Sequence, residues 1–237
     1  MSYSELLVIP YNIEKHGEQV QLLLDKYLKP TYLDRMGLRA DEVTEKDCLA
    51  EDILDSRGVF AKKFEGCSFV VVNKWSRVLG CQLNYYVKKE QFKSDFVDSN
   101  FKIMNDYSYK ESVRKYCQHR YALCRNWLPL FRTFNMRKLL YLETVLFHPD
   151  IRGLKDNKLM LEIVKRIHAV CDKDCGVLLE MMWPLDKFIK YNPLESSMVV
   201  GDVDGDGYVL IERTISYDKF VIPVLFKPPE ELKKSKL

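Results

Sequence analysis

The fold is decided by a central stretch, residues 142–164, which reads LETVLFHPDIRGLKDNKLMLEIV. An apolar run ends at His148-Pro149, a charged loop follows, and apolar residues then recur at helical spacing from about Asn157 onward. Continuous apolar runs are typical of buried strands, and a period of 3.6 residues is typical of amphipathic helices. The stretch therefore predicts a buried strand, a short loop and a helix that packs back on the sheet.

The flanking segments extend this unit into a sheet. GVLLEMMW at 176–183 predicts a second buried strand, followed by a short helix at Leu185–Tyr191. A strand, a crossover helix and a strand form a parallel pair. Five other apolar segments predict further strands: SELLVIP (4–10), SFVVVN (68–73), VLGCQLNYYV (78–87), YVLIERTIS (208–216) and FVIPVLF (220–226). Of these, SFVVVN and VLGCQLNYYV are expected to form a hairpin.

Helices are predicted between these strands. HGEQVQLLLDKYLK at 16–29 has a helical apolar stripe that Pro30 should end, and Thr44 with Asp47 begins a second helix as a capping box. Residues 88–137 are predicted to be a helical insertion. The sequence contains no repeat or low-complexity linker, so we expect one domain over residues 1–230 and an exposed basic tail at 231–237.

Composition narrows the functional classes. The chain has 237 residues, of which 47% are hydrophobic and 30% charged, and 37 Lys and Arg face 34 Asp and Glu. So small a surplus argues against a nucleic-acid-binding role. No apolar run is long enough to span a membrane, so no membrane partner is expected. The seven cysteines lie mostly in apolar segments, a pattern typical of buried free thiols in a reducing compartment.

The central unit resembles a known family. The strand that ends at Phe147-His148-Pro149, the Arg152-Gly153 pair and the following helix resemble motif A of the GNAT superfamily of N-acetyltransferases. The insertion before the central strand is most similar to the arylalkylamine N-acetyltransferase branch. The resemblance implies an α/β (α+β) fold with a mixed, mostly antiparallel sheet, a splayed central parallel strand pair and flanking helices. It implies acetyl transfer from acetyl-CoA to a small primary amine, with aromatic amines as one candidate class.

A binding site for acetyl-CoA follows from the same motif. A pyrophosphate is held by backbone N–H groups at a helix N-terminus, where glycines permit close approach. The resemblance implies that the pantetheine arm pairs with the backbone of Leu146, Phe147 and His148. It assigns the pyrophosphate to Arg152, Gly153, Leu154, Lys155, Asp156, Asn157 and Lys158.

The loop departs from the family pattern, because Lys155 and Asn157 stand where the family has small residues. Three functions therefore remain open. The chain is an N-acetyltransferase, a non-catalytic GNAT-fold binding protein that has lost acetyl-CoA binding, or an acyltransferase that uses a longer acyl-CoA.

Two carboxylates are candidate general bases. Glu143 is the only charge in LLYLETVLFHP, and Glu180 is the only charge in GVLLEMMW. A charge inside a buried strand is costly unless it is paired or functional, and burial raises a carboxyl pKa toward the range of a base. Pairing with a surface Lys or Arg is the alternative for each. The resemblance implies a tyrosine that protonates the departing thiolate, and Tyr191 is the candidate, with core packing as its alternative.

Aromatic residues offer walls for an apolar substrate pocket, although core packing explains them equally well. They lie in the early region and in the insertion: Tyr27, Tyr32, Tyr107, Tyr109, Tyr116, Tyr121 and Trp127.

Two further motifs bear on location and metals. The chain ends in Ser235-Lys236-Leu237, which is the peroxisomal address, so a peroxisomal import receptor is an expected partner and the peroxisomal matrix an expected location, with the cytoplasm as the alternative. The segment DVDGDGYVLIER, from Asp202, resembles a calcium loop, but Arg213 occupies the position of its bidentate Glu. A hairpin turn is the favoured interpretation, and no metal is expected.

Overall fold

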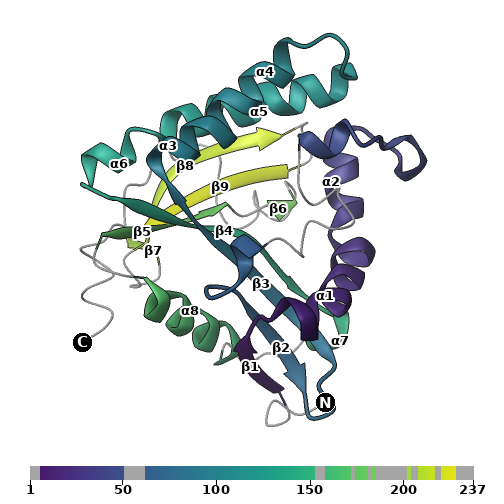
Figure 1. The fold of residues 1–237 in the computed structure, drawn as a ribbon, viewed down its shortest axis with the longest axis vertical. Coiled ribbons are helices and arrows are strands. Elements are labelled where there is room, and N and C mark those ends of the chain that lie inside the picture. The colour runs from purple at the N-terminus through teal and green to yellow at the C-terminus, as the bar shows by residue number, and fades with distance from the viewer. Residues whose placement is uncertain are drawn as a thin grey trace.

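The computed structural model describes residues 6–50, 62–152, 158–171, 174–180, 183–184, 202–203, 208–216 and 220–227. Its strands form one sheet in the order β1-β2-β3-β4-β5-β9-β8-β7, with β6 beside β9 (Figure 1). Their bounds are β1 (Leu6–Pro10), β2 (Phe69–Asn73), β3 (Val78–Lys88), β4 (Lys138–Phe147), β5 (Cys175–Glu180), β6 (Trp183–Pro184), β7 (Asp202–Val203), β8 (Tyr208–Ser216) and β9 (Phe220–Lys227).

The sheet is mixed and mostly antiparallel. Strands β4 and β5 run parallel, and the other strand pairs of the described chain are antiparallel. The crossover between β4 and β5 includes α7 (Pro149–Arg152) and α8 (Lys158–Val170). The predicted parallel pair, the β2–β3 hairpin and the mostly antiparallel sheet are confirmed.

One face of the sheet is covered by α8. The apolar stripe of this helix, formed by Leu159, Ile163 and Ile167, packs against Leu140 and Leu142 of β4 in a single buried cluster. Helix α8 shows the 3.6-residue period that the sequence predicts, because every side chain on one stripe must meet the sheet.

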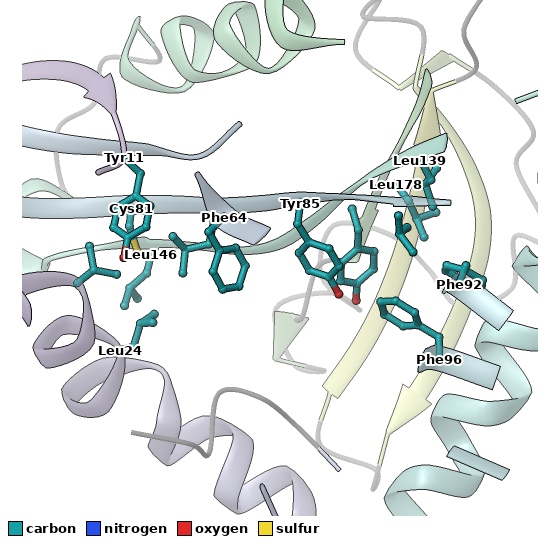
Figure 2. Close-up of a cluster of buried hydrophobic side chains, with 14 of the residues drawn as sticks. Tyr11, Leu24, Phe64, Cys81, Tyr85, Phe92, Phe96, Leu139, Leu146 and Leu178 are labelled. Atoms are coloured by element: carbon teal, nitrogen blue, oxygen red, sulfur yellow. The ribbon is translucent and has the colours of Figure 1, made fainter. Parts of the chain in front are cut away.

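The opposite face is covered by α1 (Ile13–Tyr27) and by helices of the insertion. Leu24 of α1 and Phe92 and Phe96 of the insertion share one apolar cluster with alternate residues of the strands, including Tyr85 and Leu139 (Figure 2). The central strands are therefore buried on both faces, which explains why they read as continuous apolar runs.

Five helical segments lie between β3 and β4: α3 (Lys89–Phe92), the π-helical η7 (Lys93–Asp98), α4 (Ser99–Asn105), α5 (Glu111–Trp127) and α6 (Leu130–Thr133). A separate apolar cluster joins α4 and α5 to α2 (Lys29–Met36) through Met36, Ile103 and Tyr116. Helix α2, near the N-terminus, is thereby packed against α4 and α5 of the insertion.

Two predicted helix boundaries differ in the structure. Pro30 does not simply end a helix. Helix α1 stops at Tyr27, and Pro30 occupies the first turn of α2, where its missing N–H has no helical partner to lose. The capping pair forms as predicted, with the Asp47 N–H donating to Thr44 Oγ1 at 3.3 Å. However, it begins only a 3-10 turn, η3 (Asp47–Leu49), and residues 51–61 lie outside the described chain. Further 3-10 turns are η2 (Ala40–Glu42) and η6 (Lys62–Phe64).

All seven cysteines are free thiols, and six of them are buried. Burial raises the pKa of Cys81 to about 12 and contributes most to raising that of Cys67 to about 11. The thiolate is the reactive form, so these thiols are chemically quiet. The prediction of buried free thiols is confirmed.

Candidate functional site where two strands part

The site lies where the parallel strands β4 and β5 separate. Their pairing runs from Lys138 opposite Cys175 to Leu142 opposite Leu179 and then stops. Strand β4 continues to Phe147, whereas β5 ends at Glu180. The second half of β4 thus has β3 on one edge and no described strand on the other.

A β-bulge coincides with this parting. Leu83 of β3 pairs with Thr144, and the next residue, Asn84, pairs with Leu142, so Glu143 is the extra residue. A bulge bends its strand and re-aims a side chain. Alternation along β4 places Glu143 on the same face as Tyr141. Glu143, one of the two predicted candidate bases, therefore lies at the bulge, next to the point where β4 and β5 separate.

The open edge of β4 exposes specific backbone groups. The His148 N–H donates to the Leu79 carbonyl at 2.7 Å, and Leu146 lies opposite Cys81. Successive residues direct their backbone groups to opposite edges, so those of Val145 and Phe147 point away from β3. Of the three backbone positions predicted to pair with a pantetheine arm, Phe147 lies on the open edge.

His148 is held from several sides. Its carbonyl accepts the Ile151 N–H at 3.0 Å, and its Nδ1 accepts the Asp150 N–H at 3.2 Å. Its Nε2 lies 3.1 Å from Tyr27 Oη, and the two rings meet edge to face. The Asp150 Oδ2 atom also lies 3.2 Å from Nδ1, and the direction of the hydrogen bond between Nε2 and Tyr27 depends on the tautomer of the ring. These contacts tie α1, β4 and α7 together at the mouth of the predicted phosphate loop.

Phe147 is fitted closely against β3. A Cβ atom on Gly80 would lie 2.6 Å from Phe147 Cδ1 and 3.0 Å from the Leu146 carbonyl oxygen. Real Cβ atoms do not approach so closely, and glycine alone supplies this space. Gly80 therefore permits the position of the last residue of β4.

A cavity of about 320 Å³ adjoins the bulge, on the face that the insertion covers. Glu143 lines it from β4, Tyr85 from β3, Arg120 from α5 and Lys63 from η6. The remaining lining residues are Leu49, Ala50, Gln91, Ser94, Asp95, Phe96, Ser99 and Asn100. Its size suits a small organic molecule, and its walls contain both carboxylates and cations.

The wall opposite the sheet is formed by an irregular helix. Segment η7 contributes Ser94, Asp95 and Phe96 to the cavity. The buried Asn100 side chain donates to the Phe96 carbonyl at 2.6 Å, which holds the π-turn in place. Phe96 then stacks on Tyr85 at 6.3 Å between ring centroids (Figure 2). π-turns are rare and frequently mark functional sites.

The predicted aromatic walls are placed elsewhere. Tyr116 and Trp127 are buried in the core clusters, and Tyr32 and Tyr109 pack against one of them. Tyr107 is 85% exposed, while Tyr121 contacts Phe101. Tyr27 lines a second pocket of about 190 Å³ with His148, Lys26 and Arg77. Core packing therefore explains most of these rings, and Tyr85 and Phe96 supply the aromatic surface of the cavity beside Glu143.

Several predicted site residues fall outside the described chain, namely Gly153, Leu154, Lys155, Asp156, Asn157 and Tyr191. Arg152 ends α7, and Lys158 begins α8, so the two helices frame the predicted phosphate loop. Glu180 is the last residue of β5, with its backbone opposite Val224 of β9.

The described parts of the calcium-like segment lie in paired antiparallel strands, and residues 204–207 between them lie outside the described chain. Asp202 pairs with Val209, and Val203 with Tyr208, as expected for the favoured interpretation. Among the described residues, no group of three or more His, Cys, Asp or Glu side chains is arranged to hold a metal ion. None of the described helices is long and apolar enough to cross a membrane.

Arg120 is a cavity residue that the sequence analysis missed although the sequence contains a signal for it. The buried stripe of α5 contains Val113, Tyr116 and Cys117 and continues to Leu123. Arg120 lies on that stripe and is only 8% exposed. A charge in the apolar period of a helix is the signal that identifies it. Lys63 and Asp95 carry no comparable signal, because isolated charges in polar segments are ordinary.

Comparison with known proteins places this geometry in context. No protein-family model matches the sequence, and no curated protein sequence is significantly similar to it. Solved structures match over nearly the whole chain. A mutant agmatine N-acetyltransferase in its apo form superposes with a TM-score of 0.62 at 13% identity, over 94% of this chain and 99% of that one. The chain has the GNAT fold.

Two insect structures lead to the same assignment. The polyamine N-acetyltransferase of Drosophila melanogaster matches with a TM-score of 0.61 at 13% identity, over 94% of this chain and all of that one (100%). The mosquito protein named arylalkylamine N-acetyltransferase like 5b matches with a TM-score of 0.56 at 11% identity, over 94% of this chain and 99% of that one. The GNAT resemblance predicted from the central stretch is thus confirmed for the fold, and its layout recurs in the arylalkylamine branch.

Proposed function

We propose that the protein is an amine N-acetyltransferase that transfers the acetyl group of acetyl-CoA to a primary amine in the cavity beside Glu143. The observation that supports this most directly is the coincidence of three features at one place. The parallel strands part, β4 bulges, and a cavity with a carboxylate opens there. The matched structures named above as N-acetyltransferases of agmatine, polyamines and arylalkylamines support an amine as acceptor.

The donor fits the open edge of β4. An extended arm with amide groups can pair with the outward backbone groups of Val145 and Phe147 in the way that an added strand would. The N-terminus of α8 at Lys158 offers a helix end to a pyrophosphate, and its dipole favours anions. Residues 152–158 would hold the phosphates, with Lys155 supplying charge in place of the missing small residue.

Acetyl-CoA would supply the thioester, whose bond to sulfur breaks as the amine nitrogen bonds to the carbonyl carbon. The amine must first lose a proton, because an ammonium has no lone pair. Glu143 is the proposed acceptor of that proton, directly or through one water, and Glu180 is the second candidate. The released thiolate takes up a proton, and Tyr191 is the proposed donor.

Two alternatives keep specific support. Lys155 and Asn157 in place of small residues favour a GNAT-fold protein that binds a ligand without acetyl-CoA. A longer acyl-CoA as donor would be consistent with a peroxisomal location. The terminal Ser235-Lys236-Leu237 supports that location and recognition by a peroxisomal import receptor.

Calorimetric titration of acetyl-CoA, CoA and a long-chain acyl-CoA into the purified full chain tests the proposal. We expect micromolar binding of acetyl-CoA, and tighter binding of the long-chain donor would favour the third function. The same titrations with Lys155→Gly/Asn157→Gly examine the loop. If only this glycine variant bound acetyl-CoA, the native chain would keep the fold without the donor site, and the proposal would be wrong.

A further inference from the structure

We propose that the pocket of about 190 Å³ beside His148 binds a small phosphate ester. This site is separate from the acceptor cavity and from the donor edge of β4, and it goes beyond the proposed acetyl transfer. Two of the described residues that line the pocket, Lys26 and Arg77, are cations, and none of them is a carboxylate. A concave surface of one charge sign attracts a ligand of the opposite sign.

Lys26 brings a positive charge from the exposed side of α1. On a helix, the residues three and four positions away are the ones that can pair with a side chain. For Lys26 these are Leu22, Leu23, Lys29 and Pro30, which include no carboxylate. The adjacent Asp25 carboxylate instead accepts the Gln21 side chain at 3.0 Å and lies 3.9 Å from Lys29 Nζ. The Lys26 ammonium lies 5.2 Å from the centroid of the Tyr27 ring, inside the same pocket.

Arg77 brings the second positive charge from the turn between β2 and β3. Its N–H donates to Asn73 Oδ1 at 3.0 Å, and its carbonyl accepts the Asn73 N–H at 3.1 Å, so its backbone is fixed. The next N–H, that of Val78, donates to Gln19 Oε1 at 2.9 Å, which holds the turn against α1. Arg77 and Lys26 therefore approach one pocket from two separate elements.

A fixed pair of rings forms part of the wall. Tyr27 Oη lies 3.1 Å from His148 Nε2, and the two rings meet edge to face. Asp150 Oδ2 lies 3.2 Å from the other ring nitrogen, Nδ1, and Asp150 is not among the described residues that line the pocket. The carboxylate nearest to His148 is thus directed to the ring atom that does not contact Tyr27.

The pocket lies on the opposite side of His148 from the proposed donor. Arg77 and Val78 come from the β3 side, and the His148 N–H bonds to the Leu79 carbonyl of β3 at 2.7 Å. The donor is proposed at the other edge of β4, which Phe147 faces with its backbone groups. A donor bound at that edge would leave the pocket available to a different ligand.

A phosphate ester matches both the charges and the apolar wall. A phosphate monoester carries about −1.5 to −2 charges at pH 7 and has three acceptor oxygens, so it can contact a guanidinium and an ammonium together. Leu22, which is 69% exposed, and the buried Leu23 give the same pocket an apolar side for an organic group. The volume is below the range of about 300–1,000 Å³ typical of ligand pockets, so the ligand must be small.

Phenyl phosphate is the probe, with benzyl alcohol as its uncharged match and inorganic phosphate as the anion without an apolar group. Dissociation constants are measured by ligand-observed NMR on the full chain, with and without saturating CoA. We expect phenyl phosphate to bind at least about tenfold more tightly than either comparison ligand, with CoA present or absent. Equal binding of any two of these ligands, or loss of phenyl phosphate binding when CoA is added, would overturn the inference.

Variants locate the contact. Arg77→Gln and Lys26→Gln should each weaken phenyl phosphate about tenfold, because each removes one charge-assisted contact. Lys15→Gln is the matched control, since Lys15 is an exposed cation on α1 outside the pocket. Both pocket cations are exposed, so their variants should fold, as circular dichroism would check. Unchanged affinity in Arg77→Gln and Lys26→Gln would contradict the assignment.

The two proposals fail separately. If phenyl phosphate binds with the expected variant pattern and neither CoA nor acetyl-CoA binds, the proposed acetyl transfer is wrong and the phosphate-ester site stands. If acetyl-CoA binds and phenyl phosphate ignores both pocket variants, the transferase stands and the phosphate-ester site is wrong.

Discussion

Glu143 and Glu180 are the first residues beyond Leu142 and Leu179, the last paired positions of β4 and β5. Each strand therefore brings a carboxylate residue to the point where the sheet opens. For Glu143 the β-bulge and the lining of the cavity add a reason for its placement. Glu180 occupies the corresponding position on β5, so functional measurements are needed to decide which of the two carboxylates is the base.

Replacement of Glu143 should impair the chemical step. We expect Glu143→Gln to lower kcat about 100-fold or more, with little change in KM for acetyl-CoA, because a general base contributes roughly 10²–10⁴-fold. The acid limb of the pH–rate profile should flatten in the same variant. Glu18→Gln, an exposed carboxylate on α1, is the matched control. If Glu180→Gln alone shows the flattened limb, the base is Glu180.

Gly80 should be required for the end of β4. Gly80→Ala places a methyl group against the Phe147 ring and the Leu146 carbonyl, so we expect a loss of unfolding free energy of about 1–3 kcal/mol. In a double-mutant cycle, Phe147→Leu should recover part of the loss by removing ring atoms. Urea denaturation of the four proteins measures the coupling. Strictly additive effects would show that the predicted clash does not form.

His16 should make stability depend on pH. Its Nδ1 accepts the Asn12 N–H at 3.0 Å at the start of α1, which only the unprotonated nitrogen can do. Burial, with a contribution from Lys15, lowers the pKa of His16. Near pH 6.5 the unfolded chain therefore binds a proton at His16 more readily than the folded chain does. The contribution of neutral His16 to the stability of the fold is present above the unfolded pKa and is lost as the pH falls.

The measurement compares denaturant midpoints at pH 7.5 and pH 5.5. His16→Gln should show a smaller loss of stability on acidification than the native chain, because the variant has no proton to take up at this position. An identical loss in both proteins would exclude His16 as the source.

Removal of the last three residues should change the location of the protein. An N-terminally fluorescent full chain is expected in peroxisomes, and deletion of Ser235–Leu237 should disperse it. Appending Gly-Ser after Leu237 is the control, because the address is read only at the C-terminus. Unchanged distributions in both variants would contradict the proposed location.

The sequence was sufficient for the parts of the fold that depend on local periodicity. The strand ending at Phe147 is a continuous apolar run, and the helix after Asn157 has apolar residues at helical spacing, so both were predictable. The parallel pairing followed from their order. Pro30 shows the limit, because the same residue ends one helix and begins the next, and local sequence does not choose between those roles.

The cavity was not predictable, because it depends on contacts between distant elements. The bulge at Glu143 is a property of the register between β3 and β4. Lys63 and Arg120 meet at one cavity only through the packing of η6 and α5 on the same face. The aromatic residues of the insertion were ambiguous for the same reason, since core and pocket use the same side chains.

The alternation along the outer half of β4 has a consequence for amide exchange. Leu146 and His148 lie on the side bonded to β3, so their deuterium uptake should be slow, whereas Val145 and Phe147 should exchange faster. Residue-resolved exchange would therefore show two fast and two slow amides interleaved within four consecutive residues. A bound donor that pairs with this edge would slow the fast pair alone, and the end of β4 would act as a built-in reporter of occupancy.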